Sequence, residues 1–90
     1  MSHTQRDQAK LLVRVRRLTG QMQALERALL ADAACADVLQ QLASIRGAVN
    51  GLTAELMDGH LREHVLEASD DAARQQAVDE LSAILRTYIR

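Results

Sequence analysis

The fold is decided by residues 35–64, which read CADVLQQLASIRGAVNGLTAELMDGHLREH. Apolar residues recur in this stretch at alternating spacings of four and three, at Val38, Leu42, Ile45, Val49, Leu52 and Leu56. Such spacing aligns them along one side of an α-helix, as in the heptad pattern of packed helices, and no proline interrupts the run. The stretch therefore predicts one long central helix with a continuous apolar stripe.

The flanking segments predict two further helices. A second heptad pattern precedes the central helix, at Leu11, Val15, Leu18, Met22, Leu25 and Leu29. We expect Thr4 to cap this first helix and Asp32, in a short connection over residues 30–34, to cap the central one. The central helix should end between Val65 and Ala68, and Ser69 should cap a third helix. An apolar face of the third helix is formed by Val78, Leu81, Leu85 and Tyr88.

The composition agrees with a single all-α domain over residues 1–90. The chain has no proline and one aromatic residue, and its formal net charge of −1 does not by itself indicate nucleic-acid binding. Its polar start and the lack of a long apolar run predict a cytoplasmic protein without a membrane partner. A helical hairpin of this size encloses little core, so we expect an obligate homo-oligomer, a dimer or a tetramer.

Potential metal ligands lie at both ends of the apolar stripe. Cys35 precedes it, and His60 and His64 follow it at a spacing that places both imidazoles on one side of a helix. In one straight helix Cys35 and His60 lie about 37 Å apart, at ~1.5 Å per residue, and cannot share a metal ion. They meet if a second copy packs antiparallel and crosses near Gly47 and Gly51. The alternative is a solvated histidine pair and a small buried cysteine.

The hairpin brings the N-terminus toward the same place. If the first helix folds back along the central one, His3 and the chain's amine, on Ser2 once Met1 is removed, come near His60. With Cys35 from a second chain, this set of nitrogen and sulfur donors suits Ni(II), Co(II), Zn(II) or Cu rather than Mg(II) or Ca(II). The sequence offers no Ser/His/Asp order and no glycine-rich phosphate loop, so we do not expect an enzyme.

A basic stripe runs along the first helix. Arg6, Lys10, Arg14 and Arg17 fall within about 80° of one another at ~100° per residue, and Arg16 adds charge elsewhere on the helix. Repeated in an oligomer, the stripe can follow the phosphates of double-stranded DNA through backbone contacts and shape. The alternative is an ordinary solvated helix face, and no helix-turn-helix or zinc-finger pattern is present.

Essentially the whole chain resembles the CsoR/RcnR family of bacterial transcriptional repressors. The stretches that carry the resemblance are Ser2–Thr4, Arg14–Gln21, Cys35, Val38–Gln41, Ile45–Leu52, Gly59–Leu61 and Glu63–His64. The resemblance implies a three-helix protomer, an antiparallel four-helix-bundle dimer and a disc-like tetramer of two dimers. It also implies repression without a helix-turn-helix, and a DNA complex that an effector weakens.

The effector differs between branches of this family. The nickel/cobalt branch is matched by His3, Cys35, His60 and His64, whereas the copper(I) branch usually has Cys, His and Cys. The formaldehyde branch uses the equivalent cysteine with an N-terminal proline amine, where this chain has Ser2. The family's DNA-contacting positions correspond to Lys10, Arg14 and Arg17, and less directly to Arg16.

The resemblance therefore implies a repressor that Ni(II) or Co(II) releases from operator DNA, with Zn(II) or Cu binding in vitro. Two alternatives stay open. One is a formaldehyde-responsive repressor that acts through Cys35 and the N-terminal amine. The other is a metal-binding helical bundle that does not contact DNA.

Overall fold

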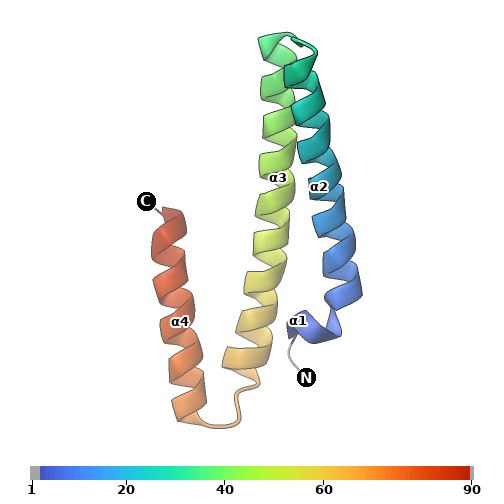
Figure 1. Cartoon of the computed structure of the whole chain (residues 1–90). Helices are drawn as coiled ribbons and strands as arrows, with labels where there is room; N and C mark the ends of the chain where they lie inside the picture. The colour runs from blue at the N-terminus through green and yellow to red at the C-terminus, as the bar shows by residue number, and fades with distance from the viewer. Residues whose placement is uncertain (1–2, 90) are drawn as a thin grey trace. The chain divides into compact units, whose positions relative to one another are not determined.

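The structure is a computed structural model that describes residues 3–89, and these residues form helices joined by short turns (Figure 1). The helices are α1 (His3–Arg6), α2 (Gln8–Leu30), α3 (Cys35–His60), the π-helix η1 (Leu61–Leu66) and α4 (Asp71–Ile89). No strand occurs between residues 3 and 89, which confirms the all-α prediction. Across these same residues, no helix has the length and apolar character that a bilayer crossing needs.

The chain divides into two compact units, which are described separately. One unit is Asp7–Thr53, and the other joins Met1–Arg6 to Ala54–Arg90. The predicted first helix is interrupted where the units meet in the sequence, because Asp7 has φ −99° and ψ 13° and separates α1 from α2. The expectation of a single domain over residues 1–90 stays a prediction.

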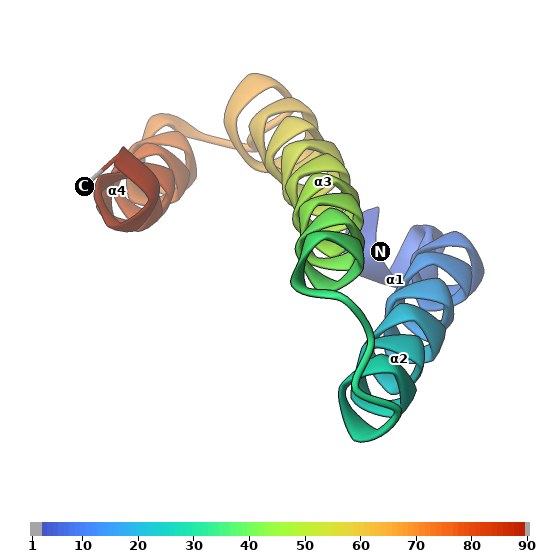
Figure 2. The same ribbon diagram turned by 90° about the horizontal axis from the view of Figure 1, so that it is seen from above.

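The unit Asp7–Thr53 is an antiparallel helical hairpin, in which α2 and the first part of α3 lie side by side (Figures 1 and 2). Leu25 is buried in this hairpin, and the Gln21 side-chain amide donates a hydrogen bond to Ser44 Oγ at 3.3 Å. Many of the predicted heptad residues remain exposed, among them Val15, Met22, Leu29, Leu42 and Val49. One chain therefore covers only part of its own apolar stripe.

The turn of this hairpin is closed by Asp32, which ends α2 and does not cap α3. Asp32 has a φ of 56°, its N–H donates to Leu29 O at 3.2 Å, and the Ala33 N–H donates to Ala28 O at 2.9 Å. This pair of hydrogen bonds around a left-handed residue is the Schellman motif of helix C-termini. The predicted N-cap role is wrong because an N-cap needs extended backbone. Cys35 is consequently the first residue of α3.

The second unit is built around the packing of α4 against η1. Ala77 and Leu81 of α4 are buried, and Arg74 Nε donates to Val65 O at 2.9 Å. The predicted apolar face of this helix is only partly covered, since Tyr88 is exposed. Helix α3 continues directly into η1, and this helical run ends at Leu66. The sequence predicted that it would end between Val65 and Ala68.

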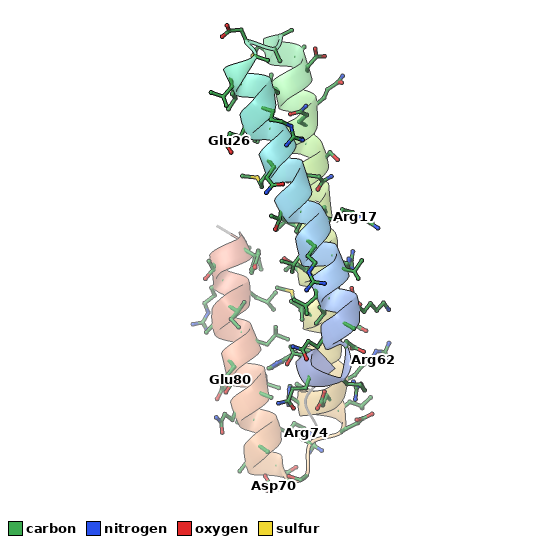
Figure 3. All side chains as sticks on the ribbon, turned by 45° about the vertical axis from the view of Figure 1, so that its right-hand side comes forward. Arg17, Glu26, Arg62, Asp70, Arg74 and Glu80 are labelled. Carbon is green, nitrogen blue, oxygen red and sulfur yellow. The ribbon has the colours of Figure 1, made fainter. Side chains whose placement is uncertain are left out.

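Two predicted helix caps in this unit are wrong. The Ala73 N–H donates to Asp70 Oδ1 at 2.7 Å, so Asp70, at the start of α4 in Figure 3, is the N-cap in place of Ser69. The first helix begins at His3, so Thr4 lies inside it and does not cap it. Asp70 replaces Ser69 because its carboxylate is the group that reaches the third N–H of the helix.

Candidate metal centre

Three histidines from different elements meet in the unit that contains both ends of the chain. His3 belongs to α1, His60 is the last residue of α3, and His64 lies within η1. One ring nitrogen from each can be chosen so that all three lie within 4.8 Å of one another. The His64 ring is central, with its centroid 5.4 Å from that of His3 and 5.0 Å from that of His60. The sequence expectation that His3 comes near His60 agrees with this geometry.

The geometry fits a metal ion that binds imidazole. Metal–nitrogen bonds of ~2.1 Å place two ligand atoms at most about 4.2 Å apart, on opposite sides of the ion. The three ring nitrogens lie within 4.8 Å of one another, so the rings must move closer together to share one ion. The rings line an open groove of about 920 Å³, which leaves space for further ligands.

His60 is oriented by the backbone of α4. Its Nε2 lies 3.1 Å from the carbonyl oxygen of the buried Ala77. A carbonyl oxygen only accepts, so Nε2 donates the proton and Nδ1 of the neutral ring keeps its lone pair. Such a hydrogen bond from one ring nitrogen commonly fixes a metal-binding histidine. The packing of α4 therefore prepares His60 to ligate through Nδ1.

His3 is held against the backbone of α3. His3 is only 7% exposed and is the one buried polar or charged residue within residues 3–89. A Cβ atom placed on Gly59 would lie 2.5 Å from His3 Nδ1, so the imidazole occupies the space that any other residue at position 59 would fill. The sequence analysis noted Gly59 only as part of the family resemblance and assigned it no role, although a helical glycine beside His60 is a signal for close packing.

An ion pair connects α1 with η1 beside the histidines. Arg6 Nη2 lies 3.7 Å from Glu63 Oε2, and the two side chains are 58% and 17% exposed. Glu63 Oε2 is buried and has no hydrogen-bond partner within residues 3–89. Sequence reasoning assigned Arg6 to the basic stripe and did not foresee this pair, because it depends on the turn at Asp7.

Two further ligands were predicted, Cys35 and the amine of Ser2. Cys35 is exposed at the first residue of α3, in the unit Asp7–Thr53, and within residues 3–89 the cluster consists of histidines alone. Ser2, whose amine was expected to take part, lies outside the described residues. A thiolate ligand from Cys35 therefore stays a prediction that depends on a second chain.

The predicted DNA-contacting residues all lie on α2. Lys10, Arg16 and Arg17 are exposed, and Arg17 is labelled on α2 in Figure 3. Arg14 is half-buried, and its Nη2 would lie 2.9 Å from a Cβ placed on Gly51. Gly51 thus accommodates a side chain of its own hairpin. The predicted approach of a partner helix at this glycine stays a prediction.

Comparisons with known proteins identify a matching family, similar relatives and a similar solved structure. The family of metal-sensitive transcriptional repressors matches residues 7–87. The transcriptional repressor RcnR of Salmonella typhimurium is 48% identical over 90 residues, and an uncharacterized protein in the bioA 5′ region of Serratia marcescens is 53% identical over 91, with 100% of each chain covered in both cases. A solved glutamate-to-histidine variant of the formaldehyde-responsive regulator FrmR, from Salmonella enterica serovar Typhimurium, has a TM-score of 0.86 at 40% identity and covers 96% of this chain and 98% of its own.

Proposed function

Because the chain belongs to the family of metal-sensitive transcriptional repressors, we propose that it represses transcription until Ni(II) or Co(II) releases it from operator DNA. The observation that carries this proposal is the meeting of His3, His60 and His64, with ring nitrogens within 4.8 Å. Members of the family are regulators, so the site has the role of a sensor and not of a catalyst. We place its action in the cytoplasm, where a repressor meets chromosomal DNA.

The choice of metal rests on the chemistry of the ligands. Imidazole nitrogen suits Ni(II), Co(II), Zn(II) and Cu(II), whereas Mg(II) and Ca(II) prefer oxygen. Three imidazoles, a Cys35 thiolate and the amine of Ser2 provide up to five protein ligands, more than the four of a closed tetrahedral zinc site. This number favours Ni(II) or Co(II) as effector, with Zn(II) or Cu able to bind in vitro.

A complete site needs a second copy of the chain. Cys35 and His60 are the first and last residues of α3, so the thiolate must come from an antiparallel partner. The exposed apolar residues of the hairpin, such as Val15, Leu42 and Val49, give such a partner a surface to cover. We therefore propose a homo-oligomer, either a dimer or a tetramer of two dimers, with the metal site between subunits.

The proposed link to DNA is the connection between α1 and α2. His3 lies in α1, and Lys10, Arg14, Arg16 and Arg17 follow on α2 after the turn at Asp7. An ion that ties His3 to the other histidines restrains α1 and thereby the start of the basic stripe. The effector can shift the equilibrium only if it binds the DNA-free form more tightly than the DNA-bound form.

A mobility-shift assay on the protein's own promoter tests the proposal. The protein is titrated with Ni(II), Co(II), Zn(II) and formaldehyde in separate arms. We expect Ni(II) and Co(II) to release the DNA at the lowest free concentrations. Affinity alone cannot replace this assay, since binding strength follows the Irving–Williams order whatever the physiological metal is. A protein that binds its promoter and ignores all three metals contradicts the proposal.

A second candidate function is formaldehyde sensing. It is favoured by the structural likeness to the formaldehyde-responsive regulator and by the exposed thiol of Cys35. The reacting groups would be that thiolate and the N-terminal amine, and imidazoles would be dispensable. His64→Ala separates the two candidates, because it should remove the response to Ni(II) and Co(II) and preserve a response to formaldehyde.

A further inference from the structure

Gly59 is a helical glycine whose backbone conformation does not call for glycine. It lies in α3 directly before His60, and none of the glycines between residues 3 and 89 has a positive φ. Glycine is the least favourable residue in a helix interior after proline. A reason for glycine at this position must therefore be sought in the space around it.

The space beside Gly59 is filled by the imidazole of His3. A Cβ atom at this position would lie 2.5 Å from Nδ1, 3.0 Å from Cγ and 3.1 Å from Cε1 of that ring. Three atoms of one ring at such distances mean that the ring lies directly against the helix backbone. Gly20 and Gly47 differ, because a Cβ on either would meet nothing within 4 Å.

We propose that Gly59 is a positioning residue of the metal centre, and that its missing side chain is what admits His3 as a third imidazole. This inference rests on the proposed metal-binding function, and it adds a residue that does not itself touch the ion. To restore an ordinary contact of 3.4 Å from 2.5 Å, the His3 ring must move by about 0.9 Å. Metal–ligand distances tolerate only about 0.2 Å.

The clash removes His3 from the site without unfolding the chain. The His3 ring lines an open groove, and it can rotate outward about its side-chain bonds. No atom of His60 or His64 is among the three nearest to a Cβ at Gly59, and the hydrogen bond from His60 to Ala77 O does not involve Gly59. Gly59→Ala should therefore leave two of the three imidazoles in place.

The contact itself is tested on the metal-free protein by a double-mutant cycle of thermal unfolding. Gly20→Ala is the matched control, since an added methyl group there meets nothing and alanine favours the helix. We expect Gly20→Ala to raise the unfolding midpoint and Gly59→Ala to raise it less or to lower it. In a His3→Ala background, Gly59→Ala should raise the midpoint as Gly20→Ala does. If Gly59→Ala raises the unfolding midpoint equally in the wild-type and the His3→Ala background, the inferred contact between Gly59 and His3 is wrong.

The role in metal binding is tested by Co(II) titration against a competing chelator. We expect Gly59→Ala and His3→Ala to lose affinity equally, by about 10- to 100-fold, and the double variant to lose no more than either one. Wild-type affinity in Gly59→Ala, or a further loss in the double variant, overturns the inference. If the wild-type protein binds no Co(II), the proposed function fails, while the unfolding cycle still decides whether Gly59 accommodates His3.

Discussion

The ion pair between Arg6 and Glu63 should make a small and measurable contribution to metal binding. At 3.7 Å, with Arg6 58% exposed, it resembles a surface ion pair, for which about 0.2–1 kcal/mol is expected after solvent screening. The pair connects α1, which carries His3, to η1, which carries His64. If this free energy keeps α1 in place for binding, its loss lowers the apparent metal affinity by about 1.4- to 5-fold.

The assay is a double-mutant cycle of Co(II) affinity with Arg6→Gln, Glu63→Gln and the combined variant. The cycle is needed because each single substitution also changes the net charge beside the bound Co(II) ion. Arg6→Gln removes a positive charge, whereas Glu63→Gln removes a negative one. Arg62→Gln is the matched control, since Arg62 pairs with Asp58 at 2.9 Å within one helical run and holds no other segment. A coupling of zero refutes the reasoning, and so does a coupling near 100-fold, which is far more than an exposed ion pair supplies.

Three further outcomes are expected. Arg17→Ala should weaken operator binding, lower the slope of log affinity against log salt by about one, and leave Co(II) affinity unchanged, as measured by fluorescence anisotropy at several salt concentrations; an unchanged slope removes Arg17 from the DNA interface. Asp70→Ala should destabilise the protein by about 0.5–2 kcal/mol in denaturant unfolding, because the Ala73 N–H loses its acceptor, whereas Ser69→Ala should be nearly neutral; the reverse order contradicts the observed cap. Sedimentation at micromolar concentration should show a dimer or a tetramer, and a folded monomer there would exclude a site shared between chains.

The long helices could be predicted because periodicity is a property of the sequence alone. The heptad positions from Val38 to Leu56 require only that apolar residues share one side of a helix, and the structure has this helix. The heptad pattern did not reveal that many of these apolar residues are exposed in a single chain. Their burial depends on which other helix packs against them. Val49 is an example, at 43% exposed.

The helix boundaries were predicted less well, because capping depends on backbone angles that residue type does not determine. Asp32 and Ser69 are both common N-cap residues, yet Asp32 adopts a left-handed conformation that ends a helix, and the neighbouring Asp70 provides the capping oxygen. The π-helix that carries His64 was not foreseen either, because an α-helix would have satisfied the same sequence pattern. π-Helical turns are rare and often occur at functional sites.

The sequence predicted that the three histidines come together, and it did not predict the contacts that hold them in place. His60 and His64 are recognisable by spacing, and His3 follows from the hairpin. The carbonyl of Ala77 that orients His60, the space beside Gly59 and the Arg6–Glu63 pair depend on tertiary contacts. Such contacts join residues far apart in the sequence, so no local pattern indicates them.

The central claim is that an ion bound by the three histidines releases the protein from DNA. Its most direct test is Co(II)-dependent release of a labelled promoter fragment, followed by anisotropy together with the cobalt–thiolate absorption of Cys35, for the wild-type protein and His64→Ala. We expect the wild-type protein to leave the DNA as the absorption band grows. His64→Ala should remain bound at Co(II) concentrations at least about tenfold higher. Release of both proteins at the same Co(II) concentration would contradict the claim.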